Sequence, residues 1–399
     1  MRVVGLALLL GACGSQGGST ADSPSSSSLR EPVTVATQPP AETTAAPTTV
    51  APRPTTTAAS TPTTPTTETP VETSPPITGP CTFDPPTAGG EITHIESGRL
   101  LGKDGDATER CLEEGLTTNA PVQWSATGDR FLTADNVITG SQGGEPSGVA
   151  ATDTDVSWSA PTGKALISID PASQHLIWHS NATGETKDIS FLARTDEAVY
   201  HPAGKGIAAV GMAEDGTYGI WLASNRGSDR QLITRIDDPT TPASHLSFSA
   251  DGRALFFIHR AVHSLVLDGL YLTELGAEGR QEDNLVVSNV DMAWANTTGA
   301  CDTSGSVIAN GADLRAEPGS PFADRTQTLQ PVGWLAGARL IVAVRPTGCE
   351  GPADVWMWTG SGAQHEFTKV GHGWNAISVR TPHGPFVDLP DQIEQAAPG

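Results

Sequence analysis

The stretch His245–Leu255 of this 399-residue chain has the sequence HLSFSADGRAL, and it contains the local pattern that decides the fold. Apolar and polar residues alternate up to Phe248, as expected for a half-buried β-strand. Ser249–Gly252 then predicts a tight turn, because glycine readily adopts the positive φ that such turns require. A second apolar run, Ala254–Ile258, predicts the returning strand. The stretch therefore predicts a β-hairpin whose first strand ends at a large apolar side chain.

The same hairpin pattern recurs along the chain after residue 115. The clearer copies are PVQWSATGDRFL (121–132), DVSWSAPTGKAL (155–166) and AVYHPAGKGI (198–207), with weaker copies around Trp294 and Trp334 and a last copy over 377–387. The apolar residue that ends the first strand recurs from Trp124 to Val379 with a mean spacing of 42.5 residues. Four strands in about 40–45 residues is typical of a β-propeller blade. We predict an all-β protein with a propeller of seven blades, and six blades as the alternative.

The turns resemble those of the TolB-type propeller repeat, which usually reads Ser-Pro-Asp-Gly and also builds the propeller of prolyl oligopeptidases. Ser249–Gly252 (SADG) and His201–Gly204 (HPAG) are the best matches in this chain. The resemblance covers most of residues 120–390. It implies the propeller fold but no particular ligand or activity.

The two ends of the repeat region predict how the ring of blades closes. The last copy leaves room for two strands before Leu389, while residues 91–113 precede the first copy. Within 91–113, Arg99–Leu101 and Glu109–Leu112 suit the two outer strands of the same blade. We expect the N- and C-terminal strands to share this blade, because their pairing removes two exposed strand edges.

The first residues indicate export. Arg2 precedes a short apolar run, Val3–Leu10, and small residues follow it, as in a secretory signal. The run is far shorter than the roughly 20 residues that span a bilayer. Leu10–Cys13 (LGAC) resembles a bacterial lipobox, in which the cysteine thiol receives a diacylglyceryl group and becomes the mature N-terminus. We predict a lipoprotein signal peptide over 1–12, lipidation of Cys13, and a location on the cell membrane facing outside the cytoplasm.

Composition divides the rest of the chain. Residues 1–80 contain no aromatic residue, and Ser, Thr and Pro make up 39 of the 62 residues from Ser19 to Pro80. Such a segment buries too little apolar surface to offset its ordering entropy. We predict a disordered tether over 13–80, the propeller domain over 81–390, and a flexible tail over 391–399.

The formal net charge is −22. This balance argues against a nucleic acid or an anionic lipid surface as the partner, since both attract clustered Lys and Arg.

The cysteine count favours disulfides. Beside Cys13 the chain has Cys81, Cys111, Cys301 and Cys349, and an even number in an exported protein indicates disulfide pairing. Of the three possible pairings, Cys81–Cys111 with Cys301–Cys349 is the most local. We expect the first bond to fix the closing blade. The second needs a strand register different from the one predicted here, and free thiols are the alternative.

Motifs for catalysis are missing from the sequence. Gly-x-Ser-x-Gly, the P-loop pattern and His-Glu-x-x-His do not occur. His201, His245 and His372 lie beside predicted blade ends and, with Trp374, are candidates for the mouth of the central channel. Three histidines near one axis are able to hold a metal, but turn residues with ordinary hydrogen bonds are the simpler interpretation. We expect no catalytic residue, metal or cofactor.

These observations predict a membrane-anchored, exported propeller that acts as a binding or scaffold module at the bacterial cell envelope. The expected partner is an envelope protein or a cell-wall glycan, not a nucleic acid. The alternative is an exported propeller enzyme of the lactonase, lyase or hydrolase type, with a metal or an acid/base site in its channel.

Overall fold

The computed structural model describes residues 79–381, except 105–107, 136, 141–144, 147–148, 150–152, 159–164, 182, 205, 268–270, 277–280, 289–290, 298–301 and 361–364. Across these residues the regular structure consists of β-strands, and no helix long and apolar enough to span a membrane is found. The strands belong to the second of two units into which the chain divides, residues 73–399. The predicted signal peptide, tether and tail, with Cys13, lie outside the described residues.

Five antiparallel four-stranded sheets follow one another along the chain and form blades 2 to 6. Blade 2 contains β4 (Gln123–Trp124), β5 (Arg130–Leu132), β6 (Val137–Gly140) and β7 (Glu145–Pro146). Blade 3 contains β8 (Thr154–Trp158), β9 (Ala165–Asp170), β10 (His175–Ser180) and β11 (Thr186–Asp188). Blade 4 contains β12 (Arg194–Tyr200), β13 (Gly206–Met212), β14 (Tyr218–Ser224) and β15 (Gln231–Arg235).

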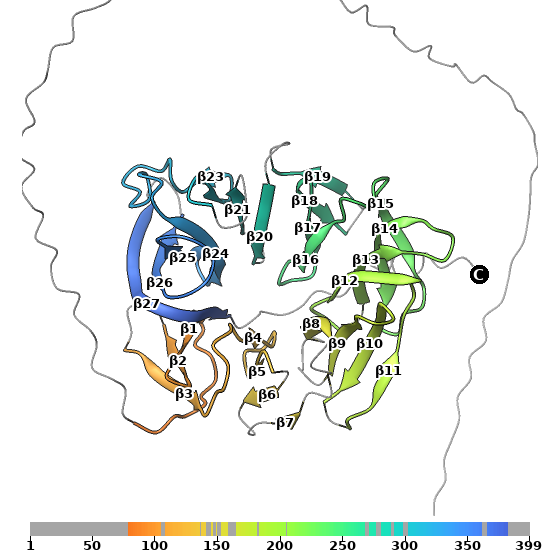
Figure 1. Cartoon of the computed structure of the whole chain (residues 1–399), viewed down its shortest axis with the longest axis horizontal. Helices are drawn as coiled ribbons and strands as arrows, with labels where there is room; N and C mark the ends of the chain where they lie inside the picture. The colour runs from red at the N-terminus through yellow and green to blue at the C-terminus, as the bar shows by residue number, and fades with distance from the viewer. Residues whose placement is uncertain are drawn as a thin grey trace, which may run out of the picture. The chain divides into compact units, whose positions relative to one another are not determined.

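The next two sheets have the same order. Blade 5 contains β16 (Ser244–Phe248), β17 (Ala254–His259), β18 (Ala261–Val266) and β19 (Tyr271–Glu274). Blade 6 contains β20 (Gln281–Val287), β21 (Met292–Thr297), β22 (Ser306–Ala309) and β23 (Ala312–Asp313). Figure 1 shows the sheets arranged around a common centre, with the first strand of each nearest to it. The fold is a β-propeller.

Blades 7 and 1 share one long strand, β27 (Glu366–Arg380). Its first part pairs with β26 and forms the outermost strand of blade 7. The other strands of blade 7 are β24 (Thr328–Leu335), β25 (Arg339–Arg345) and β26 (Ala353–Thr359). Its second part, from Asn375, pairs with β1 and so becomes the first strand of blade 1. Blade 1 is completed by β1 (Glu91–Glu96), β2 (Arg99–Lys103) and β3 (Arg110–Glu114). The ring therefore has seven blades, and the N- and C-terminal strands close it, as predicted.

Two details of the prediction are wrong. The closing blade takes three strands from the N-terminal side and one from the C-terminal side, not two from each. Glu91–Glu96 was missed because its buried positions include polar residues, so its hydrophobic pattern is weak. The copy placed at Trp294 also has the wrong register, since Trp294 lies on β21, the second strand of blade 6. The turn of that blade precedes it, where Ser288 N–H donates to Asp291 O.

The core lies between the blades. Seven clusters of buried apolar side chains occur among the described residues, one at each contact between neighbouring blades. Trp158, Trp294 and Trp334 are each buried in one of these clusters, consistent with an inter-blade role for the large residues of the repeat. Burial of apolar area stabilises the ring by about 25 cal/mol per Å².

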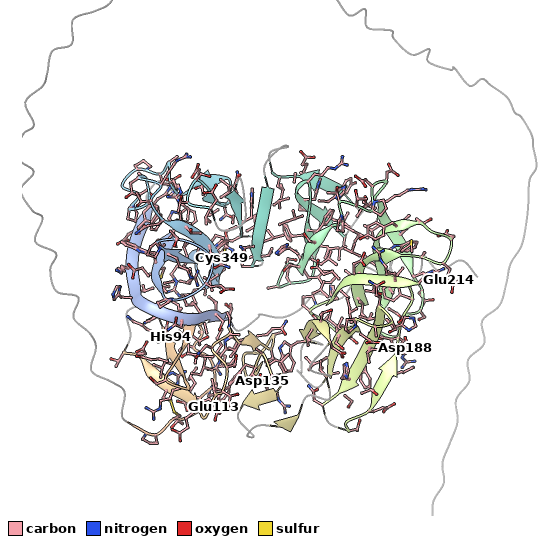
Figure 2. All side chains as sticks on the ribbon, in the orientation of Figure 1. His94, Glu113, Asp135, Asp188, Glu214 and Cys349 are labelled. Carbon is pink, nitrogen blue, oxygen red and sulfur yellow. A yellow bond between two sulfur atoms is a disulfide. The ribbon has the colours of Figure 1, made fainter. Side chains whose placement is uncertain are left out.

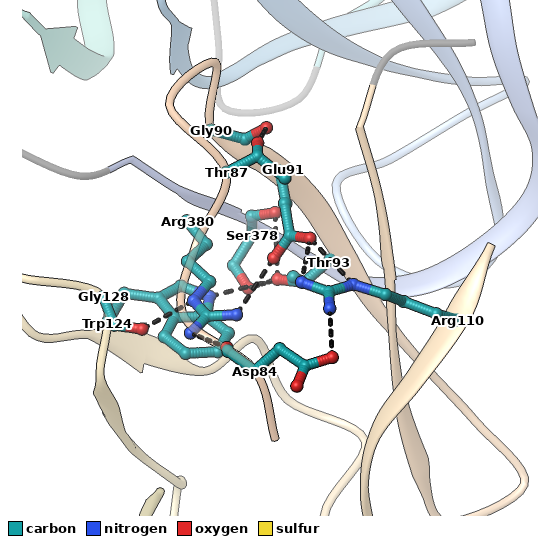
Figure 3. Close-up of polar contacts among 10 residues, drawn as sticks. All are labelled: Asp84, Thr87, Gly90, Glu91, Thr93, Arg110, Trp124, Gly128, Ser378 and Arg380. Carbon is teal, nitrogen blue, oxygen red and sulfur yellow. Dashed lines mark hydrogen bonds and ion pairs between the residues drawn. The ribbon is translucent and has the colours of Figure 1, made fainter. Parts of the chain in front are cut away.

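A buried polar network holds the closing blade together (Figure 3). Arg380, at the end of β27, donates through Nη1 to Glu91 Oε2 at 3.0 Å, through Nε to Gly128 O at 2.6 Å and through Nη2 to Asp84 O at 2.8 Å. Arg110 of β3 contacts the other oxygen of Glu91 and also Asp84. Charge-assisted bonds of this kind are the stronger ones in proteins. The network therefore joins both ends of the domain to blade 2.

A disulfide lies beside this network. Cys81 and Cys111 are bonded, with their Cα atoms 4.5 Å apart, and Cys111 belongs to β3 of the closing blade. Cys349 is also disulfide-bonded, whereas its predicted partner, Cys301, lies outside the described residues.

Candidate ligand-binding cavity

The first strands of the blades share a local irregularity. In six of the seven blades, the pairing between first and second strand shifts in register, and the extra residue stands on the first strand. Such β-bulges bend a strand and redirect its side chains, and they are frequent next to functional sites. Because the first strands surround the channel, the bulges alter the shape of its wall.

Three of these bulges have a residue in the left-handed region: His245 of β16 (φ 56°), Asn284 of β20 (φ 50°) and Ala376 of β27 (φ 48°). A positive φ is uncommon for residues other than glycine, and strained conformations of this kind concentrate at functional sites. The bulge at His245 is held from the neighbouring blade, where Glu197 Oε1 accepts the N–H of Leu246 at 2.5 Å. All three residues line one cavity.

The cavity has a volume of about 930 Å³ and lies where the first strands converge. Its wall comes from blades 1, 5, 6 and 7 and from the segment before β4, in this order along the chain: 95–97, 119–121, His245, 284–286, 330–332, Ala343, Arg345, 349–351 and 375–377. Figure 2 places Cys349 beside the centre of the ring. Clefts of this volume that combine apolar walls with a few polar groups are typical ligand sites.

The polar groups of the cavity are unevenly placed. Glu96 and Glu350 are exposed, whereas Arg345 is buried with 8% of its surface accessible. Gln330 Oε1 accepts from Arg345 Nη1 at 2.9 Å, and Gly351 O accepts from its Nε at 3.1 Å. Burial lowers the pKa of Arg345 below its ordinary value. The cavity thus presents two exposed carboxylates and one buried cation.

Of the predicted channel-mouth residues, only His245 lines the cavity. Its side chain is exposed, and its Nδ1 lies 3.2 Å from Ser244 Oγ. His201 is fully buried in the β12–β13 turn, with Nε2 2.9 Å from Gly252 O and its ring against Phe248. Gly252 has φ +79°, and a Cβ there would come within 2.3 Å of His201 Nε2. His201 therefore has the ordinary role of a hydrogen-bonded turn residue.

The other two predicted residues also lie on β27, but they do not line the cavity. His372 is exposed, and its Nδ1 is 2.5 Å from Asp354 Oδ1. Trp374 stacks on His94 of β1, with ring centroids 4.1 Å apart and an interplanar angle of 6°. The three predicted histidines thus do not converge, and no cluster of metal-ligating side chains is found in the described part of the chain.

One serine, histidine and aspartate do lie together, in blade 3. Ser168 Oγ donates to Asp153 Oδ2 at 2.7 Å and lies 2.7 Å from His179 Nε2. All three side chains are buried, and the serine bridges the other two residues. A nucleophilic triad instead needs the histidine in the middle and an accessible serine. This arrangement fits a hydrogen-bond network that supports the blade.

Sequence reasoning missed Arg345, Gln330 and Asn284. None belongs to a motif, and the register shifts that bring them to one wall have no clear sequence signature. The only local sign is that asparagine, as at Asn284, tolerates the left-handed region better than most residues.

No protein-family model matches the sequence, and no curated protein matches it. Among solved structures, a putative TolB from Agrobacterium tumefaciens is 13% identical with a TM-score of 0.38, covering 73% of this chain and 92% of that one. TolB from Acinetobacter baumannii is 12% identical with a TM-score of 0.40, covering 73% and 82%.

The β-propeller domain of the Trilobed protease from Pyrococcus furiosus is 10% identical with a TM-score of 0.41, covering 73% of this chain and 86% of that one. At this level of similarity, no activity or partner is transferred. The propeller fold of this chain rests on its own strand pairing.

Proposed function

We propose that this chain is an exported, membrane-anchored propeller that binds its ligand, without catalysis, in the channel cavity at the bacterial cell envelope. The observation that carries the proposal is the cavity of about 930 Å³, whose wall includes all three of the left-handed bulge residues of the first strands. Maintaining strained backbone at one wall costs free energy, and strained residues of this kind cluster at binding and active sites.

The N-terminal sequence supports the location. A lipid on Cys13 and a tether over residues 13–80 would hold the domain at the membrane while leaving the channel accessible to soluble components of the envelope. Two or more acyl chains give stable anchoring, whereas a single chain does not. The predicted partners are therefore envelope proteins or cell-wall glycans.

Native mass spectrometry of the full-length protein with a solubilised cell-wall digest tests the binding. Asn119 is exposed and lines the cavity, so Asn119→Trp fills part of it. Lys187 on the outer strand β11 is also exposed, and Lys187→Trp is the matched control. We expect the wild type and the control to bind a component that Asn119→Trp does not. Equal binding by all three proteins would show that the ligand site lies elsewhere.

Fractionation tests the anchor. Cys13→Ala should release the protein from the membrane or leave the precursor uncleaved, because the acceptor thiol is lost. Unchanged lipid labelling and membrane association in this variant would contradict the anchor.

Turnover in a screen of lactonase and hydrolase substrates, lost in Asn119→Trp, would favour the enzyme alternative.

A further inference from the structure

The described residues include three buried arginines, and they differ in how their charge is compensated. Arg380 pairs with the buried carboxylate of Glu91. Arg315 donates to four backbone carbonyls and has Asp313 and Asp324 nearby. Arg345 has neither arrangement, and it is the one that lines the cavity.

The contacts of Arg345 leave part of its guanidinium unused. Nε and Nη1 donate to two neutral oxygens, those of Gly351 and Gln330. Within the described part of the chain, Nη2 donates to no acceptor, and no carboxylate forms an ion pair with Arg345. A guanidinium has five N–H donors, and a buried charge is costly unless it is paired. In the described part of the chain Arg345 thus has no carboxylate partner, although Asp and Glu outnumber Lys and Arg by 45 to 23 in the sequence.

The neighbours of Arg345 hold it in position. Gln330 accepts from Arg345 through Oε1, and its Nε2 donates to Asn284 Oδ1 at 3.4 Å. Asn284 stands at the bulge of β20, one of the strained positions of the cavity wall. The relay from Asn284 through Gln330 to Arg345 therefore fixes the guanidinium before any ligand arrives. Such preorganisation reduces the entropy lost on binding.

The rest of the cavity restricts what the guanidinium can bind. A carboxylate matches its planar fork with two parallel hydrogen bonds. Glu96 and Glu350 line the same cavity and are exposed, so they repel a polyanion such as phosphate and attract a cationic group. Leu285, Val332 and Ile377 add apolar residues to the lining of the same cavity.

We propose that Arg345 binds the terminal carboxylate of a short apolar peptide whose free amino terminus faces Glu96 and Glu350. This proposal rests on the proposed function, because it names the ligand class of the same cavity. It also defines Arg345 as the residue that sets specificity for a free carboxyl end.

Isothermal titration of the full-length protein in detergent tests the ligand class. The probe is a pool of tripeptides of Ala, Leu and Val with free amino termini, prepared with either carboxylate or carboxamide ends. We expect the carboxylate pool to bind roughly tenfold or more tightly than the carboxamide pool, because the amide loses the charge-assisted pair. Inorganic phosphate should not compete. Equal binding of the two pools, or binding of phosphate in place of peptide, would overturn the proposal.

Variants test the residue. Arg345→Gln should lower affinity for the carboxylate pool to that of the carboxamide pool, and Arg345→Lys should recover part of the difference. Arg253 is exposed between β16 and β17 and does not line the cavity, so Arg253→Gln is the control and should bind as the wild type does. Unchanged affinity in Arg345→Gln would overturn the assignment. If Arg345→Gln does not fold, the comparison of the two pools on the wild type decides alone.

The two proposals fail in different ways. If neither pool binds, but Asn119→Trp abolishes binding of another component of the cell-wall digest, the cavity is the ligand site and the peptide proposal is wrong. If Asn119→Trp has no effect on any ligand, both proposals are wrong.

Discussion

Arg380 Nη1 lies 3.0 Å from Glu91 Oε2, and this buried ion pair joins the last residue of β27 to the first residue of β1. The two residues are 289 positions apart in sequence. Their contact therefore forms only when the two ends of the domain meet in blade 1. The pair makes the closure of the ring directly measurable by mutation.

Glu91→Gln should lower the free energy of unfolding by about 3–5 kcal/mol, because it leaves the buried guanidinium of Arg380 without its carboxylate. Urea unfolding followed by tryptophan fluorescence measures this loss. Glu114→Gln, which removes an exposed partner of Arg99 in the same blade, is the control and should cost no more than about 1 kcal/mol. Similar losses in the two variants would show that the closure does not depend on the buried pair.

His94 should make the domain less stable in mild acid. Burial, with a smaller effect of the Lys103 charge, lowers the pKa of His94 to about 4 in the folded protein. The unfolded chain binds this proton near pH 6.5, so His94 does not lower the free energy of unfolding above that pH. As the pH falls from 6.5 towards 4, the free energy of unfolding decreases by about 3 kcal/mol in total.

Urea unfolding of the wild type and His94→Gln between pH 4 and 7 measures this dependence. The variant should show a smaller loss of stability across that window. His372→Gln, at an exposed histidine, should follow the wild type. Parallel curves for the wild type and His94→Gln would mean that His94 does not contribute to the acid sensitivity.

The Cys81–Cys111 disulfide should stabilise the closing blade through the unfolded state. Its sequence separation is 30, and closing a loop of this length is worth about 3–4 kcal/mol in the chain-entropy model. The double variant Cys81→Ala/Cys111→Ala should therefore have a free energy of unfolding lower by this amount. Urea titration measures the difference. A change below about 1 kcal/mol would refute a stabilising role for this bond.

Removal of the last strand should be far more harmful than removal of the tail. A chain that ends at Gly373 lacks the part of β27 that pairs with β1, so β1 is left with an exposed edge. We expect this chain to lose more than about 5 kcal/mol or to fail to fold. A chain that ends at Pro390 keeps all of β27 and should unfold as the full chain does. Circular dichroism with urea titration compares the two, and equal stability would contradict closure by the C-terminal strand.

The sequence predicted the architecture well because the repeat is local. Each hairpin places an apolar residue, a turn and a second strand within a dozen residues, and His245–Leu255 folds in this way as β16, a turn and β17. The closing blade was predicted only in outline, because Glu91 and His94 are buried through partners distant in sequence. A hydrophobic pattern contains no information about such partners.

The candidate site was largely hidden from the sequence. His245 was found because it stands beside a strand end, but the same rule also selected His201, which is a buried turn residue. Arg345 ends a strand whose middle, Leu340–Val344, is apolar, and its importance depends on Gln330 and on a bulge in the neighbouring blade. Contacts between blades, not local spacing, bring these groups together.

Hydrogen–deuterium exchange with and without the bound component of the cell-wall digest tests the central claim most directly, because it locates the ligand. The account predicts slower exchange at 95–97, 284–286, 330–332 and 349–351, the segments that line the cavity. Blades 3 and 4, which contribute no lining residue in the described part of the chain, should be unchanged. Protection confined to those two blades, with no change around the cavity, would contradict binding in the channel.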